Sequence, residues 1–169
     1  TVVAWSSSPH PTVAQEAENR WLTERRILDM AHGGGLREAP QGTMHAYRTA
    51  AERGADVLEM DLHITLDGHV VAIHDSTVDR TTDGTGCVVA KTLAEIKELD
   101  AAHTFVPGVG PASGRPESDY PLRGVATGAV PPPAGFTAED FTIVTLEELF
   151  QELPDALMLM ELKPTEVYQ

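Results

Sequence analysis

Two carboxylates occupy alternate positions of one predicted strand. The stretch from Val57 to Ile64 is rich in branched apolar residues, which favours a β-strand. Because side chains in a strand alternate between faces, Glu59 and Asp61 share one face and the intervening apolar residues share the other. Neighbouring carboxylates repel each other and are costly to bury alone. The pair therefore predicts a site for a divalent cation with oxygen ligands, Mg²⁺ or Ca²⁺.

Four further side chains with useful chemistry follow the ends of other apolar runs: His32, His74, Glu161 and Lys163. In (β/α) barrels the carboxyl ends of the strands form one face, and active sites are built there. We therefore expect two imidazoles, three carboxylates and one ammonium to converge. The set suits metal-assisted attack at phosphorus, with Glu161 as a third metal ligand and the histidines dividing the proton transfers. Lys163 is placed to hold the remaining phosphate charge.

Strands that alternate with helical segments indicate an α/β fold with parallel strands. We predict strands at 27–32, 57–64, 69–74 and a buried strand at 157–160, and helices at 40–53, 92–99 and 145–153. Pro40 suits an early position of the first helix. Thr92 and Thr145 each precede a Glu by three positions, the spacing of a capping box.

The segment from 101 to 144 differs in character from the rest of the chain. Seven prolines fall between Pro107 and Pro133, mixed with six glycines between Gly108 and Gly135. We interpret it as a long insertion loop, which is unusual inside a compact domain and often functional. Residues 1–26 are predicted to be a mobile lead-in, and 27–169 to form the domain.

The composition excludes some classes of partner. Lys and Arg number 12 against 26 Asp and Glu, a net charge of −14, which argues against nucleic acid as a partner. No apolar run is long enough to cross a bilayer. The start of the chain lacks Met and favours a secreted or periplasmic protein, with a trimmed cytoplasmic protein as the alternative. Oligomeric state cannot be deduced from these residues.

The chain resembles the glycerophosphodiester phosphodiesterase family over roughly residues 27–165. The resemblance rests on segments whose order and spacing agree with the family: Ala31-His32-Gly33-Gly34, Glu38-Ala39-Pro40, Gly54 to Asp61, Thr65 to Gly68, His74-Asp75, Arg80 to Gly86 and Glu161-Leu162-Lys163. It implies a TIM-type barrel that hydrolyses small-molecule glycerophosphodiesters to sn-glycerol 3-phosphate and an alcohol. It also implies His32 and His74 as the acid/base pair and Glu59, Asp61 and Glu161 as metal ligands. The neighbouring glycerol hydroxyl would attack phosphorus, and the segment around 101–144 would correspond to the family's insertion.

Three features depart from the family pattern. Gly33 stands where the family usually has a phosphate-binding Arg, and Gln41-Gly42 stands where it has Glu-Asn. We expect Arg37 or Lys163 to replace the missing guanidinium. An eight-stranded barrel typically needs about 250 residues, so we interpret the chain as the amino-terminal half of such a barrel plus the insertion, and as part of a longer protein.

Several alternatives stay open at this stage. Glu161 and Lys163 could form a simple ion pair, and His63 could line the site or support it from behind. Arg80 to Thr82 are expected to shape the loop under the site by hydrogen bonding. A lysophospholipase D would use the same metal and histidine chemistry beside an apolar groove. A catalytically inactive binding protein on the same fold is the rival from another class, motivated by Gly33 and Gln41.

Overall fold

The computed structural model describes residues 24–164. The predicted lead-in, 1–26, therefore lies outside the described residues apart from 24–26. Within the described part, no helix combines the length and the apolar character needed to cross a bilayer.

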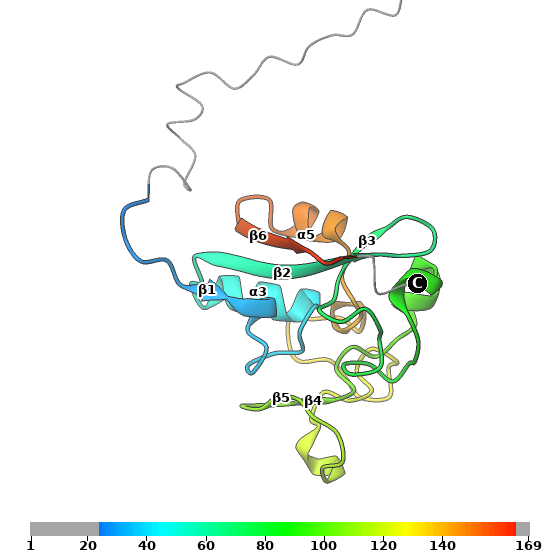
Figure 1. Ribbon diagram of the computed structural model, residues 1–169. Coiled ribbons are helices and arrows are strands. Elements are labelled where there is room, and N and C mark those ends of the chain that lie inside the picture. The colour runs from blue at the N-terminus through cyan, green and yellow to red at the C-terminus, as the bar shows by residue number, and fades with distance from the viewer. Residues whose placement is uncertain (1–23, 165–169) are drawn as a thin grey trace, which may run out of the picture.

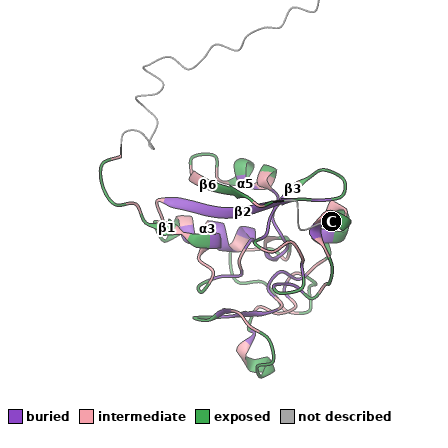
Figure 2. Ribbon diagram, in the orientation of Figure 1, coloured by how far each residue is buried: buried purple, intermediate pink, exposed green. Residues whose placement is uncertain are grey.

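The strand β2 (Val57–Ile64) is the centre of the fold, as Figure 1 shows. It pairs in parallel with β1 (Met30–Ala31) and with β6 (Leu157–Leu162), and antiparallel with β3 (Val70–Ala72). Val57 pairs with a residue of β1 and with one of β6, and Leu62 pairs with a residue of β3 and with one of β6. Therefore β1 and β3 lie along one edge of β2, and β6 lies along the other. β2 is buried along nearly its whole length (Figure 2).

Three helices pack around this sheet: α3 (Met44–Glu52), α4 (Leu93–Lys97) and α5 (Leu146–Glu152). The capping boxes predicted at Thr92 and Thr145 are both present. The first helix begins later than predicted, because Thr43 is its N-cap and accepts a hydrogen bond from the Ala46 amide. Pro40 precedes the helix and instead supplies a carbonyl that accepts from the Thr43 hydroxyl.

The main core lies between the helices and the apolar face of β2. It combines residues of α3, α5 and both strands of the β2–β3 hairpin, including Met44, Tyr47, Leu58, Met60, Leu62 and Leu149. Leu58, Met60 and Leu62 therefore share the face opposite Glu59 and Asp61, as the alternation of the strand predicts.

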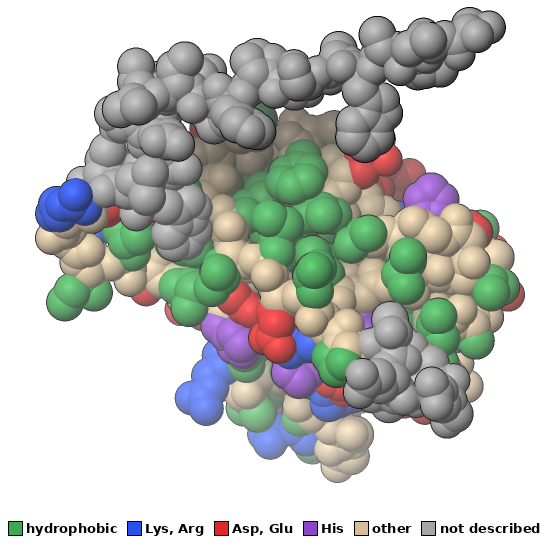
Figure 3. Space-filling view, turned by 45° about the horizontal axis from the view of Figure 1, so that its top comes forward, with side chains coloured by type: hydrophobic (Ala, Val, Ile, Leu, Met, Phe, Trp, Pro, Cys, Tyr) green, Lys and Arg blue, Asp and Glu red, His purple; other side chains and the backbone are tan. Residues whose placement is uncertain are grey.

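The prediction that the run from Leu157 is a buried strand was wrong. β6 forms as expected, but Leu159 is 44% exposed, Met160 42% and Leu162 79%. Within the described residues β6 pairs with β2 alone, so neither its outer edge nor its faces are fully covered. Figure 3 shows hydrophobic side chains gathered on this side of the molecule.

The segment predicted as an insertion loop contains structure of its own. It includes an antiparallel pair, β4 (Phe105–Val106) and β5 (Gly110–Pro111), and two short 3₁₀ turns at Glu117–Asp119 and Glu139–Phe141. A small separate core of Ala102, Val125 and Phe141 supports it. The hairpin contacts the loop after β1, where the Gly108 amide donates to the Arg37 carbonyl over 2.7 Å. The segment is thus a folded extension beside the ends of the strands.

Candidate active site

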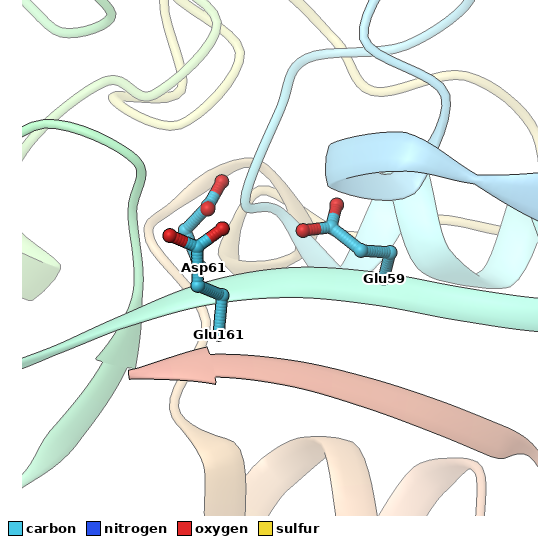
Figure 4. Close-up of side chains that lie close together, drawn as sticks. All are labelled: Glu59, Asp61 and Glu161. Carbon is cyan, nitrogen blue, oxygen red and sulfur yellow. The ribbon is translucent and has the colours of Figure 1, made fainter. Parts of the chain in front are cut away.

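Three carboxylates converge where β2 and β6 lie side by side. Glu59 and Asp61 rise from the same face of β2, and Glu161 comes from β6 (Figure 4). One ligand atom from each of the three lies within 4.8 Å of the other two. The β2–β6 register pairs Asp61 with Glu161, which brings the third carboxylate to the face that the strand alternation predicts. Glu59 and Asp61 are buried, whereas Glu161 is exposed.

Within the described part of the chain, Asp61 accepts fewer hydrogen bonds than the other two carboxylates. Both of its oxygens are buried, and neither accepts a hydrogen bond of good geometry from any residue between 24 and 164. Its close contact is an ion pair with Lys163, and a divalent cation with hard oxygen ligands would further offset the cost of burying this carboxylate. The three-carboxylate donor set and the buried Asp61 therefore fit such an ion.

Lys163 places a positive charge against two of these carboxylates. Its Nζ lies 2.8 Å from Asp61 Oδ1 and 2.7 Å from Glu161 Oε1. Burial lowers the pKa of Lys163, but the close contacts with Asp61 and Glu161 outweigh this, so its pKa lies above the ordinary value. In addition to the simple ion pair with Glu161 considered from the sequence, Lys163 also contacts Asp61.

His32 is held beside Glu59. β1 ends at Ala31, and His32 opens the 3₁₀ turn η1 (His32–Gly34), so the predicted strand 27–32 is shorter than expected. The His32 Nδ1 lies 2.9 Å from Glu59 Oε2, and the Gly33 amide donates to the same oxygen over 2.7 Å. With Nδ1 engaged, the Nε2 of this 57% exposed side chain is left for a ligand.

His74 reaches the site by a route that the sequence did not predict. We expected it at the carboxyl end of a parallel strand, but β3 runs antiparallel to β2 and so returns the chain towards Asp61, whose carbonyl accepts from the Ile73 amide. The reversal follows from the tight turn at residues 65–68, which joins neighbouring strands as a hairpin. His74 Nδ1 lies 2.7 Å from Asp75 Oδ1, and the side chain is 46% exposed.

Asp75 is itself held by Arg80, and the sequence interpretation missed this contact. The Arg80 guanidinium donates through Nε over 2.6 Å and through Nη2 over 2.9 Å to the two Asp75 oxygens. The hydrogen bond from Arg80 is the main reason why the pKa of Asp75 lies below its ordinary value. Asp75 and Arg80 both lie in segments that carry the family resemblance, and this was the signal in the sequence that could have pointed to them.

Two other predicted residues lie near the site. Arg37 is exposed and lines, together with His32, a cavity of about 450 Å³ beside β1. His63 is buried, with Nε2 3.3 Å from the His74 carbonyl, and burial lowers its pKa. His63 thus supports the backbone at His74, consistent with a place behind the site.

The chain is similar in sequence to proteins of one enzyme family. The sequence profile of the Glycerophosphoryl diester phosphodiesterase family matches residues 32–169. A glycerophosphodiester phosphodiesterase of Caldanaerobacter subterraneus is 50% identical over 80 residues, 47% of this chain and 33% of that protein. One of Bacillus subtilis is 42% identical over 93 residues, 55% of this chain and 32% of that protein. The matches thus span about a third of the length of these curated relatives.

Solved structures of similar fold agree with the sheet. A phosphodiesterase of Oleispira antarctica, in complex with the product sn-glycerol-3-phosphate, matches with a TM-score of 0.60 and 28% identity, over 83% of this chain and 46% of that one. A glycerophosphodiester phosphodiesterase of Agrobacterium tumefaciens matches with a TM-score of 0.55 and 28% identity, over 82% of this chain and 48% of that one. The TIM-type α/β fold expected from the sequence is confirmed, with about half of each matched structure covered.

Proposed function

The chain belongs to the Glycerophosphoryl diester phosphodiesterase family, and on that premise we propose that it forms the catalytic part of a metal-dependent phosphodiesterase. The proposed reaction hydrolyses a glycerophosphodiester to sn-glycerol 3-phosphate and an alcohol. The observation that carries the proposal is the convergence of three carboxylates within 4.8 Å beside two accessible histidines.

Glu59, Asp61 and Glu161 would hold the divalent cation, Mg²⁺ or Ca²⁺. When bound, the cation supplies polarisation of a phosphate oxygen and neutralises negative charge in the transition state. Support comes from Asp61, whose two buried oxygens accept no hydrogen bond from the described residues. The Lys163 ammonium contacts Asp61 and Glu161 and offsets part of their negative charge. It would also lie next to the bound phosphate.

The two histidines are oriented for complementary proton transfers. Each ring directs Nδ1 at a carboxylate, His32 at Glu59 and His74 at Asp75, which leaves Nε2 of both exposed rings available for proton transfer. One histidine takes the proton from the glycerol hydroxyl that attacks phosphorus, and the other gives a proton to the oxygen of the departing alcohol. The cyclic phosphate that results is opened by water through the same two groups acting in reverse. Arg37 lines the cavity next to His32 and is proposed to contact the substrate at its rim.

One observation favours a second candidate, a lysophospholipase D. A groove of about 210 Å³ adjoins Lys163 and is lined mainly by apolar side chains, Leu62, Ile64, Val70 and Leu162, with His63. Leu62 lies on the face of β2 opposite the carboxylates, so an acyl chain extending from a phosphodiester at the site would reach this groove by passing His63 and Lys163 at its border. The glycerophosphodiester phosphodiesterase requires only the carboxylates and the histidines. The lysophospholipase D also requires this groove to be open when the phosphodiester is bound.

The test measures release of sn-glycerol 3-phosphate from glycerophosphocholine by the intact protein, with Mg²⁺ or Ca²⁺ and then with EDTA. We expect cation-dependent release that is lost in Asp61→Asn and in His74→Ala. Asp119→Asn is the matched control, because it removes an acidic side chain paired with Arg115 in the insertion, away from the three carboxylates. Release of choline from lysophosphatidylcholine, but not of glycerol 3-phosphate from glycerophosphocholine, would favour the second candidate. Absence of both activities would overturn the enzymatic proposal.

A further inference from the structure

Arg80 connects the insertion to one of the two histidines through a chain of hydrogen bonds. Its guanidinium holds both oxygens of Asp75, and Asp75 in turn lies 2.7 Å from His74 Nδ1. A planar guanidinium that binds a carboxylate through two parallel hydrogen bonds fixes both its position and its rotation. Asp75 is therefore presented to His74 in one orientation.

The backbone of Arg80 is held as firmly as its side chain. The turn that contains it is anchored by Val78, which is fully buried and whose carbonyl accepts from both the amide and the hydroxyl of Thr82. The Arg80 carbonyl accepts a 2.8 Å hydrogen bond from the buried hydroxyl of Thr104. Thr104 belongs to the insertion, and its own carbonyl accepts from the Ala112 amide just after β5. The insertion thus contacts the backbone of Arg80, whose side chain binds Asp75.

The orientation of the His74 ring depends on this support, because the ring is not buried. Its side chain is 46% exposed, so packing restricts the ring less than it would in a core. An ionised carboxylate at Nδ1 selects the tautomer with the proton on Nδ1 and leaves Nε2 free to exchange a proton with substrate. Arg80 favours the ionised form of Asp75, because its hydrogen bonds lower the pKa of that carboxyl.

We propose that Arg80 is a positioning residue for His74, acting through Asp75, and that Thr104 extends this support into the insertion. The inference rests on the proposed function and adds a control on one acid/base group. It assigns the 101–144 segment a role in aligning the catalytic apparatus in addition to any contact with substrate.

The kinetic test uses the intact protein and a double-mutant cycle of Arg80→Ala and Asp75→Ala. Arg80→Ala should lower kcat roughly 10- to 100-fold with KM within about threefold, a part of the roughly 10²–10⁴-fold that a positioned acid or base supplies. The double variant should be no slower than Asp75→Ala alone, because Arg80 acts through Asp75. Arg80→Lys should recover only part of the loss, since an ammonium cannot make the paired contact. Thr104→Val should lower kcat by a smaller factor.

A second measurement does not depend on activity. In ¹⁵N-histidine spectra of the intact protein, His74 should show a single tautomer with the proton on Nδ1, and Arg80→Gln should give a mixture of tautomers. Arg115→Ala is the matched control, because Arg115 binds Asp119 in the insertion through Nε and should change neither readout. If wild type hydrolyses no diester, the proposed function fails, and the spectra still decide the inference. Unchanged kcat and an unchanged His74 spectrum in Arg80→Gln would overturn it, as would effects that multiply in the double variant.

Discussion

Replacing Gly33 by Arg, which would restore the residue usual in the family at this position, is expected to destabilise this chain. Gly33 has φ +58° and ψ 25°, in the left-handed region. An L-residue there costs roughly 1–2 kcal/mol relative to right-handed backbone, a cost that glycine avoids. The Gly33 amide also donates to Glu59, so the loop cannot change its backbone without disturbing a proposed metal ligand.

A side chain at position 33 also has little room. A Cβ added there would lie 3.2 Å from Gln41 Cγ and 3.5 Å from Gln41 Nε2. Gln41 is half-buried and can shift by a few tenths of an ångström, so this contact adds a smaller cost than the backbone does. The two positions that depart from the family pattern are thus neighbours in space, and an introduced Arg would project first towards Gln41.

Thermal unfolding measures the two costs separately. We expect Gly33→Arg to lower Tm by about 2–8 °C, because 1 kcal/mol corresponds to about 2–4 °C for a chain of 150–250 residues. Gly114→Arg is the matched control, since Gly114 has φ +72° and open space around its Cβ position, so only the backbone cost applies. Adding Gln41→Ala to Gly33→Arg should recover the difference between the two variants. An unchanged Tm in Gly33→Arg beside a lowered Tm in Gly114→Arg would refute the reasoning.

Three further predictions concern the charges and caps. Asp61→Asn should change the Tm measured in EDTA little, because loss of the ion pair with Lys163 is offset by removal of one of three neighbouring carboxylates, but it should abolish the increase in Tm on adding Mg²⁺ or Ca²⁺, which for wild type corresponds to about 2.7 kcal/mol at a hundred times Kd; an increase that survives in the variant would contradict the metal assignment. Thr145→Ala should cost about 1 kcal/mol, because its hydroxyl accepts from the Glu148 amide at the start of α5, and chemical denaturation would measure the loss. Because Arg80 lowers the pKa of Asp75, the stabilisation by this pair is present above the ordinary carboxyl pKa of about 3.9 and is lost as the pH falls through the lower pKa of the folded state. The Tm difference between wild type and Arg80→Gln should therefore shrink on acidification below about pH 4, and a difference that stays constant down to pH 2 would contradict this origin.

The elements that local chemistry determines could be predicted from the sequence. The bounds of β2 agree because apolar residues recur at alternate positions from Leu58 to Ile64, the period of a strand. The two capping boxes agree because their hydrogen bonds join residues only three positions apart. The shared face of Glu59 and Asp61 follows from strand alternation alone.

What depends on tertiary context was harder to predict. The exposure of β6 follows from which strands pair with it, and a run of four apolar residues carries no such information. The contact between Arg80 and Asp75 depends on how a turn five residues later folds back, which sequence spacing does not reveal. The antiparallel course of β3 was implicit in the short connection, 65–68, between two predicted strands, yet its consequence for His74 became clear only from the register.

The carboxylate site depends on the pairing of two strands as much as on the identity of its residues. Glu59 and Asp61 are fixed in a buried strand, whereas Glu161 lies in the partly exposed β6 and Lys163 directly follows it. Six residue pairs hold β6 in register with β2, and Asp61 lies opposite Glu161 in that register. Because side chains alternate, a slip of one residue would turn Glu161 and Lys163 to the other face of the sheet. The third ligand and the ammonium would then be lost together, so β2–β6 register determines whether these side chains form one site.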